Sequence, residues 1–123
     1  MIKTAITSPQ LTPPVGPYSQ AVDAIYFSGQ VGQDPTTGKL VPGGITAETD
    51  RLFQNLSAVL KAAGKSFDDV VRVGVFLTSM SDYVVMNGMY AKHFRQPFPA
   101  RTTIGVAALP LGACVEIDLV VKA

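Results

Sequence analysis

The sequence predicts an α+β fold in which two helices pack on one face of a mixed β-sheet. Three observations lead to this prediction. The chain of 123 residues is long enough for one hydrophobic core, so we expect a single domain over residues 1–123. Two segments carry apolar residues at helical spacing, and short runs rich in β-branched residues lie around them. The resulting order, β-β-α-β-α-β-β, is typical of helices segregated to one side of a sheet.

The N-terminal part predicts two neighbouring strands. Residues 12–17 are rich in proline and therefore extended, and they lead into a short strand at residues 18–22. A tight turn at Asp23 and Ala24 is expected to return the chain into a second strand at residues 25–31, because this segment begins with β-branched and aromatic residues.

The first helix is predicted over residues 46–63. Thr46 is the expected N-cap, Glu48 falls in the first turn and Gly64 ends the helix. The apolar positions that recur at helical spacing are Leu52, Phe53, Leu56, Val59, Leu60 and Ala63. This face is therefore expected to cover the sheet.

The rest of the chain predicts a strand, a second helix and two further strands. Residues 70–77 form a buried strand, and Ser81 or Asp82 then caps a helix that runs through Phe94. Proline at position 97 ends this helix. The last two strands are expected to pair as a hairpin whose loop is residues 109–112.

The composition indicates association with copies of the chain and gives no sign of nucleic-acid binding. Hydrophobic residues make up 47% of the chain and charged residues only 15%, so a monomer of this size would expose much apolar surface. Ten Lys and Arg against nine Asp and Glu give a net charge of +1. The basic residues are scattered singly, without the basic stripe that nucleic-acid binding requires.

Metal chemistry and an exported location are not expected. His93 and Cys114 are the only soft metal ligands, and His93 is interpreted as a packed histidine in the apolar stripe of the second helix. One cysteine cannot form an internal disulfide, which indicates a reducing, cytoplasmic environment. The N-terminus lacks the apolar core of a signal peptide, and the prolines between Thr4 and Val22 exclude a membrane helix.

Two charged side chains stand out within apolar strands. Arg101 opens an otherwise uncharged strand, and a guanidinium in such a place usually holds an anion, although its head could also lie in water at the strand end. Glu116 lies inside the last strand, and the alternative for it is a solvated position on the outer face beside Asp118. The predicted hairpin places Glu116 opposite Gly105, roughly 13 Å from Arg101 at about 3.3 Å per residue. The two would then meet only across a subunit interface.

Four motifs occur in a recognisable order along the chain. They are Gly16 through Val22, Phe27 through Gln30, Asn87 through Phe94, and Pro99-Ala100-Arg101 followed by Glu116-Ile117. Together they resemble the RidA/YjgF family, the reactive-intermediate deaminases formerly described as endoribonuclease or translation inhibitor. The resemblance covers nearly the whole chain. It implies a chorismate-mutase-like fold and a homotrimer with three clefts between subunits.

The resemblance also implies a reaction and a set of site residues. The reaction is hydrolysis of enamines or imines, such as 2-aminoacrylate, 2-iminopropanoate and 2-iminobutanoate, to the 2-keto acid and ammonia, without cofactor or metal. Arg101 would bind the carboxylate of the imino acid substrate, and Glu116 would position and polarise water. The residues that would line the site are Tyr18, Ser28, Gly29, Asn87 and Thr103. Many relatives carry cysteine where this chain has Thr103, and the turn between Val22 and Ser28 is shorter than usual.

Two other classes of function are compatible with the same sequence. A non-catalytic trimer that binds a small ligand or a protein would use the same clefts, because a fold does not fix a function. A ribonuclease or translation inhibitor is disfavoured by the balanced charge.

Overall fold

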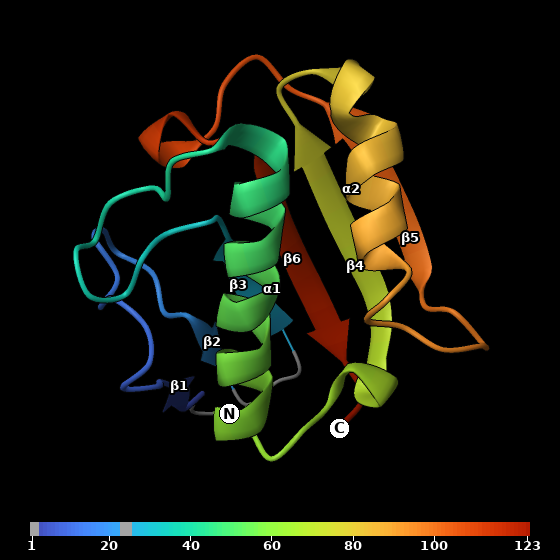
Figure 1. Ribbon diagram of the computed structural model, residues 1–123. Coiled ribbons are helices and arrows are strands. Elements are labelled where there is room, and N and C mark those ends of the chain that lie inside the picture. The colour runs from blue at the N-terminus through green and yellow to red at the C-terminus, as the bar shows by residue number, and fades with distance from the viewer. Residues whose placement is uncertain (1–2, 23–25) are drawn as a thin grey trace.

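The computed structural model, which describes residues 3–22 and 26–123, is a six-stranded sheet with two helices in front of one face (Figure 1). The strands are β1 (Ala5–Ile6), β2 (Ala21–Val22), β3 (Tyr26–Gln30), β4 (Val70–Leu77), β5 (Ala100–Gly105) and β6 (Val115–Val121), and the helices are α1 (Gly44–Ala62) and α2 (Tyr83–Tyr90). Their order in the sheet is β1-β2-β3-β6-β4-β5. Only β4 and β5 pair in parallel, so the sheet is mixed and the predicted fold class is confirmed.

The core lies between this sheet and the two helices. Alternate residues of β6, Val115 and Ile117, are fully buried, as expected for a strand with one face against the core. Leu52 and Leu56 of α1 are also fully buried, and both belong to the predicted apolar face. The same alternation leaves every second residue of β6 on the face without helices.

Helix α1 begins earlier than predicted. Its N-cap is Gly43 and not the predicted Thr46. Gly43 has φ of 116°, a backbone conformation that glycine adopts readily and threonine does not. Glu48, which was expected in the first turn, consequently lies beyond it, and its side chain is buried. The predicted stop at Gly64 is confirmed, since this residue has φ of 71° just past the helix.

Helix α2 ends earlier than predicted. It stops at Tyr90, a turn over residues 91–93 follows, and Phe94 lies just past this turn. The physical reason is aromatic packing, because the His93 ring stacks on Phe53 of α1 at 4.1 Å between centroids and Phe94 contacts the same ring. Burial lowers the pKa of His93, in keeping with a packed histidine. Asp82 stands at the N-cap without a side-chain hydrogen bond to the helix.

The predicted C-terminal hairpin is wrong. Strand β5 pairs with one edge of β4 and β6 with the other, so the two last strands never touch each other in the ladder. The segment between them crosses the end of β4, where Val106 donates to the Leu77 carbonyl and Thr78 donates to the Cys114 carbonyl. Glu116 therefore lies opposite Phe76 and not opposite Gly105.

The N-terminal strands are shorter than predicted. Only residues 21–22 of the expected strand at 18–22 enter the ladder, and they also pair with β1, which the sequence did not indicate. The proline-rich segment before them lacks the N–H donors that a longer ladder needs. The predicted turn at Asp23 and Ala24, and Ile25 at the start of the next strand, lie outside the described residues. No helix in the described part of the chain is long and apolar enough to cross a bilayer.

Gly32 marks the closest approach between α1 and the segment after β3. A Cβ at this position would lie 2.7 Å from both the Cα and the carbonyl oxygen of Glu48, and backbone atoms cannot move aside as a flexible side chain can. We expect Gly32→Ala to lower the free energy of unfolding by about 1–3 kcal/mol. Chemical denaturation followed by circular dichroism measures this change.

Gly88 provides the matched control. It lies in α2, and a Cβ there would meet nothing within 4 Å. Gly88→Ala should therefore leave stability unchanged or raise it by up to about 1 kcal/mol, because alanine favours the helix. Equal stability of the two alanine variants would contradict the packing described here.

Candidate functional site

The seven site residues named from the sequence fall into two groups on opposite faces of the sheet. Arg101 pairs in register with Val73, which is fully buried under the helices, so Arg101 projects on the helix side. Glu116 stands between Val115 and Ile117, which are also buried under the helices, so it projects on the other side. Side-chain rotation alone cannot bring the two together within one chain.

The first group centres on Arg101, at the outer edge of the sheet beside α2. Its guanidinium lies 4.5 Å from the centroid of the Tyr90 ring and 5.7 Å from that of Tyr83. It also donates a hydrogen bond of 2.9 Å to the Tyr83 hydroxyl. Burial raises the pKa of Tyr90, and the Arg101 charge opposes that shift. Two aromatic residues thus hold a cation in place, and no carboxylate is paired with it among the described residues.

Thr103 and Asn87 belong to the same group. Thr103 follows Arg101 by two residues and so shares its face of β5, and its hydroxyl oxygen is buried with no hydrogen-bond partner among the described residues. Asn87 lies on α2 between Tyr83 and Tyr90 at spacings of four and three residues, which places it on the helix face that bears both tyrosines.

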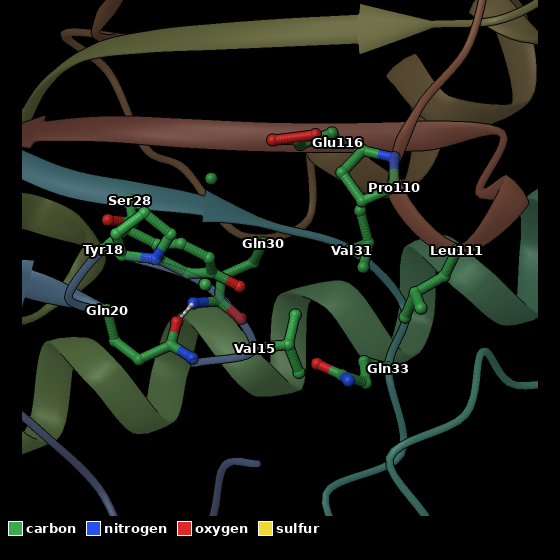
Figure 2. Close-up of a pocket in the computed structure, with 13 residues that line it drawn as sticks. Val15, Tyr18, Gln20, Ser28, Gln30, Val31, Gln33, Pro110, Leu111 and Glu116 are labelled. Atoms are coloured by element: carbon green, nitrogen blue, oxygen red, sulfur yellow. Dashed lines mark hydrogen bonds between the residues drawn. The ribbon is translucent and has the colours of Figure 1, made fainter. Parts of the chain in front are cut away.

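The second group lines a pocket of about 450 Å³ on the far side of the sheet (Figure 2). Tyr18, Ser28, Gly29 and Glu116 all border it. Gly29 is needed for this arrangement, because a Cβ at that position would overlap the Glu116 carboxylate. A glycine in β3 therefore makes room for the acidic side chain of the adjacent strand.

Hydrogen bonds between side chains and the N-terminal segment shape this pocket. The Gln30 amide donates to the Gln20 side-chain oxygen, and Gln20 donates to the Thr12 carbonyl at 3.2 Å. The Ser28 hydroxyl donates to the Ser19 carbonyl. These bonds fix the segment that carries Tyr18 against β3.

The Glu116 carboxylate has an unusual electrostatic environment. Burial raises its pKa above the usual value for glutamate, and repulsion by Asp118 on the same face of β6 raises it further. A carboxylate with a raised pKa is a stronger base than an exposed one, provided that the solution pH keeps it ionised. Glu116 is therefore better suited to accept a proton than an exposed glutamate is.

A buried carboxylate of α1 anchors the start of β6. Glu48 accepts a hydrogen bond of 2.9 Å from the backbone N–H of Cys114, two residues before Glu116. Burial and the neighbouring Glu48 raise the pKa of the Cys114 thiol to about 12, so this cysteine is not a nucleophile at neutral pH. Its position directly before β6, the strand that carries Glu116, supports a structural role.

Several lining residues were not named from the sequence. Tyr83 and Tyr90 flank Asn87 at helical spacing, which was a usable signal. By contrast, Val15 lines the pocket from an irregular segment, and Pro110 and Leu111 line it from a short 3-10 helix (Pro110–Gly112). No periodic pattern identifies these residues in the sequence. Within residues 3–22 and 26–123, no three His, Cys, Asp or Glu side chains lie close enough to hold a metal ion together.

Comparison with known proteins places the chain in a family. A sequence model of the family described as Endoribonuclease L-PSP matches residues 9–123. A mouse protein named 2-iminobutanoate/2-iminopropanoate deaminase is 44% identical over 98% of this chain and 91% of its own length. The chain belongs to the RidA/YjgF family. The resemblance found in the sequence motifs is thereby confirmed.

Solved structures of RidA/YjgF proteins agree with the fold. The crystal structure described as RidA from the Antarctic bacterium Psychrobacter sp. PAMC 21119 superposes with a TM-score of 0.92, at 40% identity, over 98% of this chain and 99% of that one. A protein from Thermotoga maritima MSB8, described as a putative endoribonuclease, gives a TM-score of 0.92 at 40% identity over 99% of both chains. The chorismate-mutase-like α+β architecture expected of a RidA/YjgF protein is therefore present.

The like charge of Asp118 gives a testable effect on Glu116. Asp118→Asn should lower the pKa of Glu116, which would still stay above the usual value because burial is the larger cause. The ionised form of Glu116 would then persist to lower pH in the variant than in the wild type. Carbon-13 NMR titration of the Glu116 carboxyl measures this shift.

Asp50→Asn is the control, because Asp50 is an exposed carboxylate of α1 whose hydrogen-bond partner is Gln54. It should leave the Glu116 titration unchanged. An unchanged Glu116 pKa in Asp118→Asn would show that the two carboxylates do not interact.

Proposed function

We propose that this protein hydrolyses 2-imino acids, and the enamines in equilibrium with them, to 2-keto acids and ammonia. One observation carries the proposal. Arg101, packed against two tyrosine rings, and Glu116, a half-buried carboxylate with a raised pKa, occur in a chain that is 44% identical to a mouse protein named 2-iminobutanoate/2-iminopropanoate deaminase. The carboxylate of an imino acid would bind Arg101, and its hydrolysis needs a water molecule that Glu116 would activate.

The proposed mechanism uses only side chains of the site. Arg101 binds the substrate carboxylate through two parallel hydrogen bonds, a geometry that lysine would not reproduce. Glu116 accepts a proton as water adds to C2 of the iminium, which forms a carbinolamine. Glu116 then returns the proton to the nitrogen. The C–N bond breaks as the carbinolamine hydroxyl gives its proton to Glu116, and the 2-keto acid and ammonia leave. Tyr18, Ser28, Gly29, Asn87 and Thr103 line the space around the substrate.

Two catalytic side chains, Arg101 and Glu116, are sufficient for this reaction. The iminium carbon is already electrophilic, and each tenfold acceleration requires only about 1.4 kcal/mol of transition-state stabilisation. Positioning of the carboxylate and of one water, together with proton transfer, supplies gains of this order without a covalent nucleophile. The inert Cys114 thiol is consistent with such a mechanism.

The proposed assembly is a homotrimer with three clefts between subunits. Its support is geometric: Arg101 and Glu116 project from opposite faces of one sheet, so a working site needs Arg101 of one subunit and Glu116 of another. The low charged fraction of 15% also favours an assembly that covers apolar surface. The small-molecule substrate would bind in the cleft where the two groups meet.

Two alternatives are outcomes of the same experiments. A non-catalytic trimer would bind carboxylates without accelerating imine decay. A ribonuclease, the activity named in the family description Endoribonuclease L-PSP, would cleave RNA in proportion to intact protein. The net charge of +1 argues against tight binding of a phosphate backbone.

Substitutions should separate substrate holding from water activation. Arg101→Ala should lower kcat/KM at least about tenfold, because a hydrogen bond to a charged group contributes about 1.5–3 kcal/mol. Glu116→Gln keeps the shape but loses the base, so turnover should fall while binding of unreactive carboxylates survives. Keto-acid formation from imines generated by an amino-acid oxidase measures both effects.

Arg95→Ala serves as the control, since Arg95 is exposed and pairs with Asp68 away from both groups. It should retain wild-type rates. Full activity in Arg101→Ala would show that the site is assigned wrongly, and imine decay unaffected by the wild-type protein would favour the binding-only alternative.

Mixing two impaired variants tests the shared cleft. Arg101→Ala and Glu116→Gln, mixed in equal amounts under conditions of subunit exchange, should regain activity in about a quarter of the clefts, because each of the two positions carries the intact residue in half of the cases. A mixture of Arg101→Ala with the double variant should stay inactive. No recovery in samples that native mass spectrometry shows to be mixed trimers would contradict the proposed cleft.

A further inference from the structure

Leu111 has a backbone conformation that its own packing does not explain. It is the only non-glycine residue with positive φ in the described part of the chain, at φ 62° and ψ 13°. The left-handed conformation is unfavourable for a residue with a Cβ, and it persists only where the surroundings enforce it. Burial does not compensate here, because 50% of Leu111 remains exposed. Glycine, which the chain places next at position 112, would adopt the same conformation without strain.

The Leu111 side chain lines the same pocket as Glu116. In Figure 2, Leu111 and Pro110 lie at one end of this pocket, with Val15 facing them, while Tyr18 and Ser28 lie at the other end. Val15 is 75% exposed, so two aliphatic side chains border the pocket with little burial of their own. An apolar ligand group placed between them would remove both from water.

The polar side chains near this end are already engaged within the chain. The Gln33 amide donates to the Gly38 carbonyl at 2.9 Å, and the Gln30 amide donates to Gln20. Because both amides donate to partners within the chain, the end of the pocket near Leu111 offers chiefly aliphatic surface. A polar or charged substrate side chain would lose hydration there without gaining an equivalent partner.

The pocket is also larger than a small imine requires. Its volume of about 450 Å³ falls within the range of roughly 300–1,000 Å³ that is typical of pockets for drug-sized ligands. The methyl group of an alanine-derived imine would leave most of this space to water. A longer or branched aliphatic group would fill it and contact Leu111.

We propose that Leu111, with Val15 opposite, selects imino acids that carry a bulky aliphatic side chain, such as those derived from leucine or methionine. This inference rests on the proposed function and specifies the substrate class of the same site. The left-handed turn at Leu111 then serves to present an aliphatic side chain to the substrate. Leu111 acts on specificity and takes no part in proton transfer.

The test compares imines from leucine and alanine, each generated in situ by an amino-acid oxidase. The wild-type protein should show the higher kcat/KM with the leucine-derived imine, and Leu111→Gly should reduce the leucine-to-alanine ratio about tenfold, as expected when contacts with a few methyl groups are lost. Leu111→Met keeps an aliphatic side chain and should keep the ratio. Glycine accepts the positive φ, so Leu111→Gly should unfold at the same temperature or higher.

Binding of the unreactive products gives a second readout that does not need activity. Calorimetry with 4-methyl-2-oxopentanoate and 2-oxopropanoate should show a preference for the larger acid that Leu111→Gly abolishes. If the wild type hydrolyses imines but the ratio is the same in Leu111→Gly, the inference is wrong and the proposed function stands. If no imine is hydrolysed but the binding preference depends on Leu111, the proposed function is wrong and the selection of bulky aliphatic groups by Leu111 stands. Absence of both overturns both.

Discussion

Burial of alternate residues along β6 is the constraint on which the site depends. Val115, Ile117 and Leu119 pack beneath the helices, and the period of two in a strand then sends Glu116 and Asp118 to the opposite face. The same rule applied to β5, two strands away, keeps Arg101 on the helix side. The separation of the two charged residues is therefore a consequence of core packing, and it could not be altered without moving a hydrophobic strand.

Each half of the site carries a charge that is only partly solvated. Arg101 rests against two tyrosine rings, which attract a cation but do not neutralise it. Glu116 lies beside Asp118, so its nearest charged neighbour repels it. Under the proposed function, the carboxylate and the iminium group of the substrate would supply the missing opposite charges. The electrostatic frame is then complementary to an imino acid as a whole, with the anion-binding and proton-accepting roles kept apart.

Much of the fold was predictable, and the reasons for the failures are physical. The apolar face of α1, the strand at residues 70–77 and the family motifs follow from local patterns, and these were confirmed. The sequence could not predict that β5 and β6 each pair with β4 and not with each other. The segment between them contains Pro110 and Gly112, and such a segment fits a hairpin and a crossing connection equally well. The end of α2 depends on contacts with Phe53, which lies 40 residues away from His93 in the chain.

The site shows the same division between local and non-local information. Arg101 and Glu116 were identifiable because each is a charge within an apolar strand. Two other features depend on how the strands and their connections meet in space. Gly29 makes room for Glu116, and Leu111 has positive φ. Family motifs therefore indicate the candidate residues, whereas the shape of the surrounding pocket comes only from the tertiary structure.

The environment of Cys114 has a practical consequence for spectroscopy. A thiol with a pKa of about 12 has only about one part in 100,000 in the reactive thiolate form at pH 7, so alkylating reagents would modify it very slowly. Cys114 is also the only cysteine of the chain. A cysteine introduced at an exposed position would therefore react with a maleimide dye or spin label far ahead of the native one. Distances between the subunits of the proposed homotrimer could then be measured with Cys114 left in place.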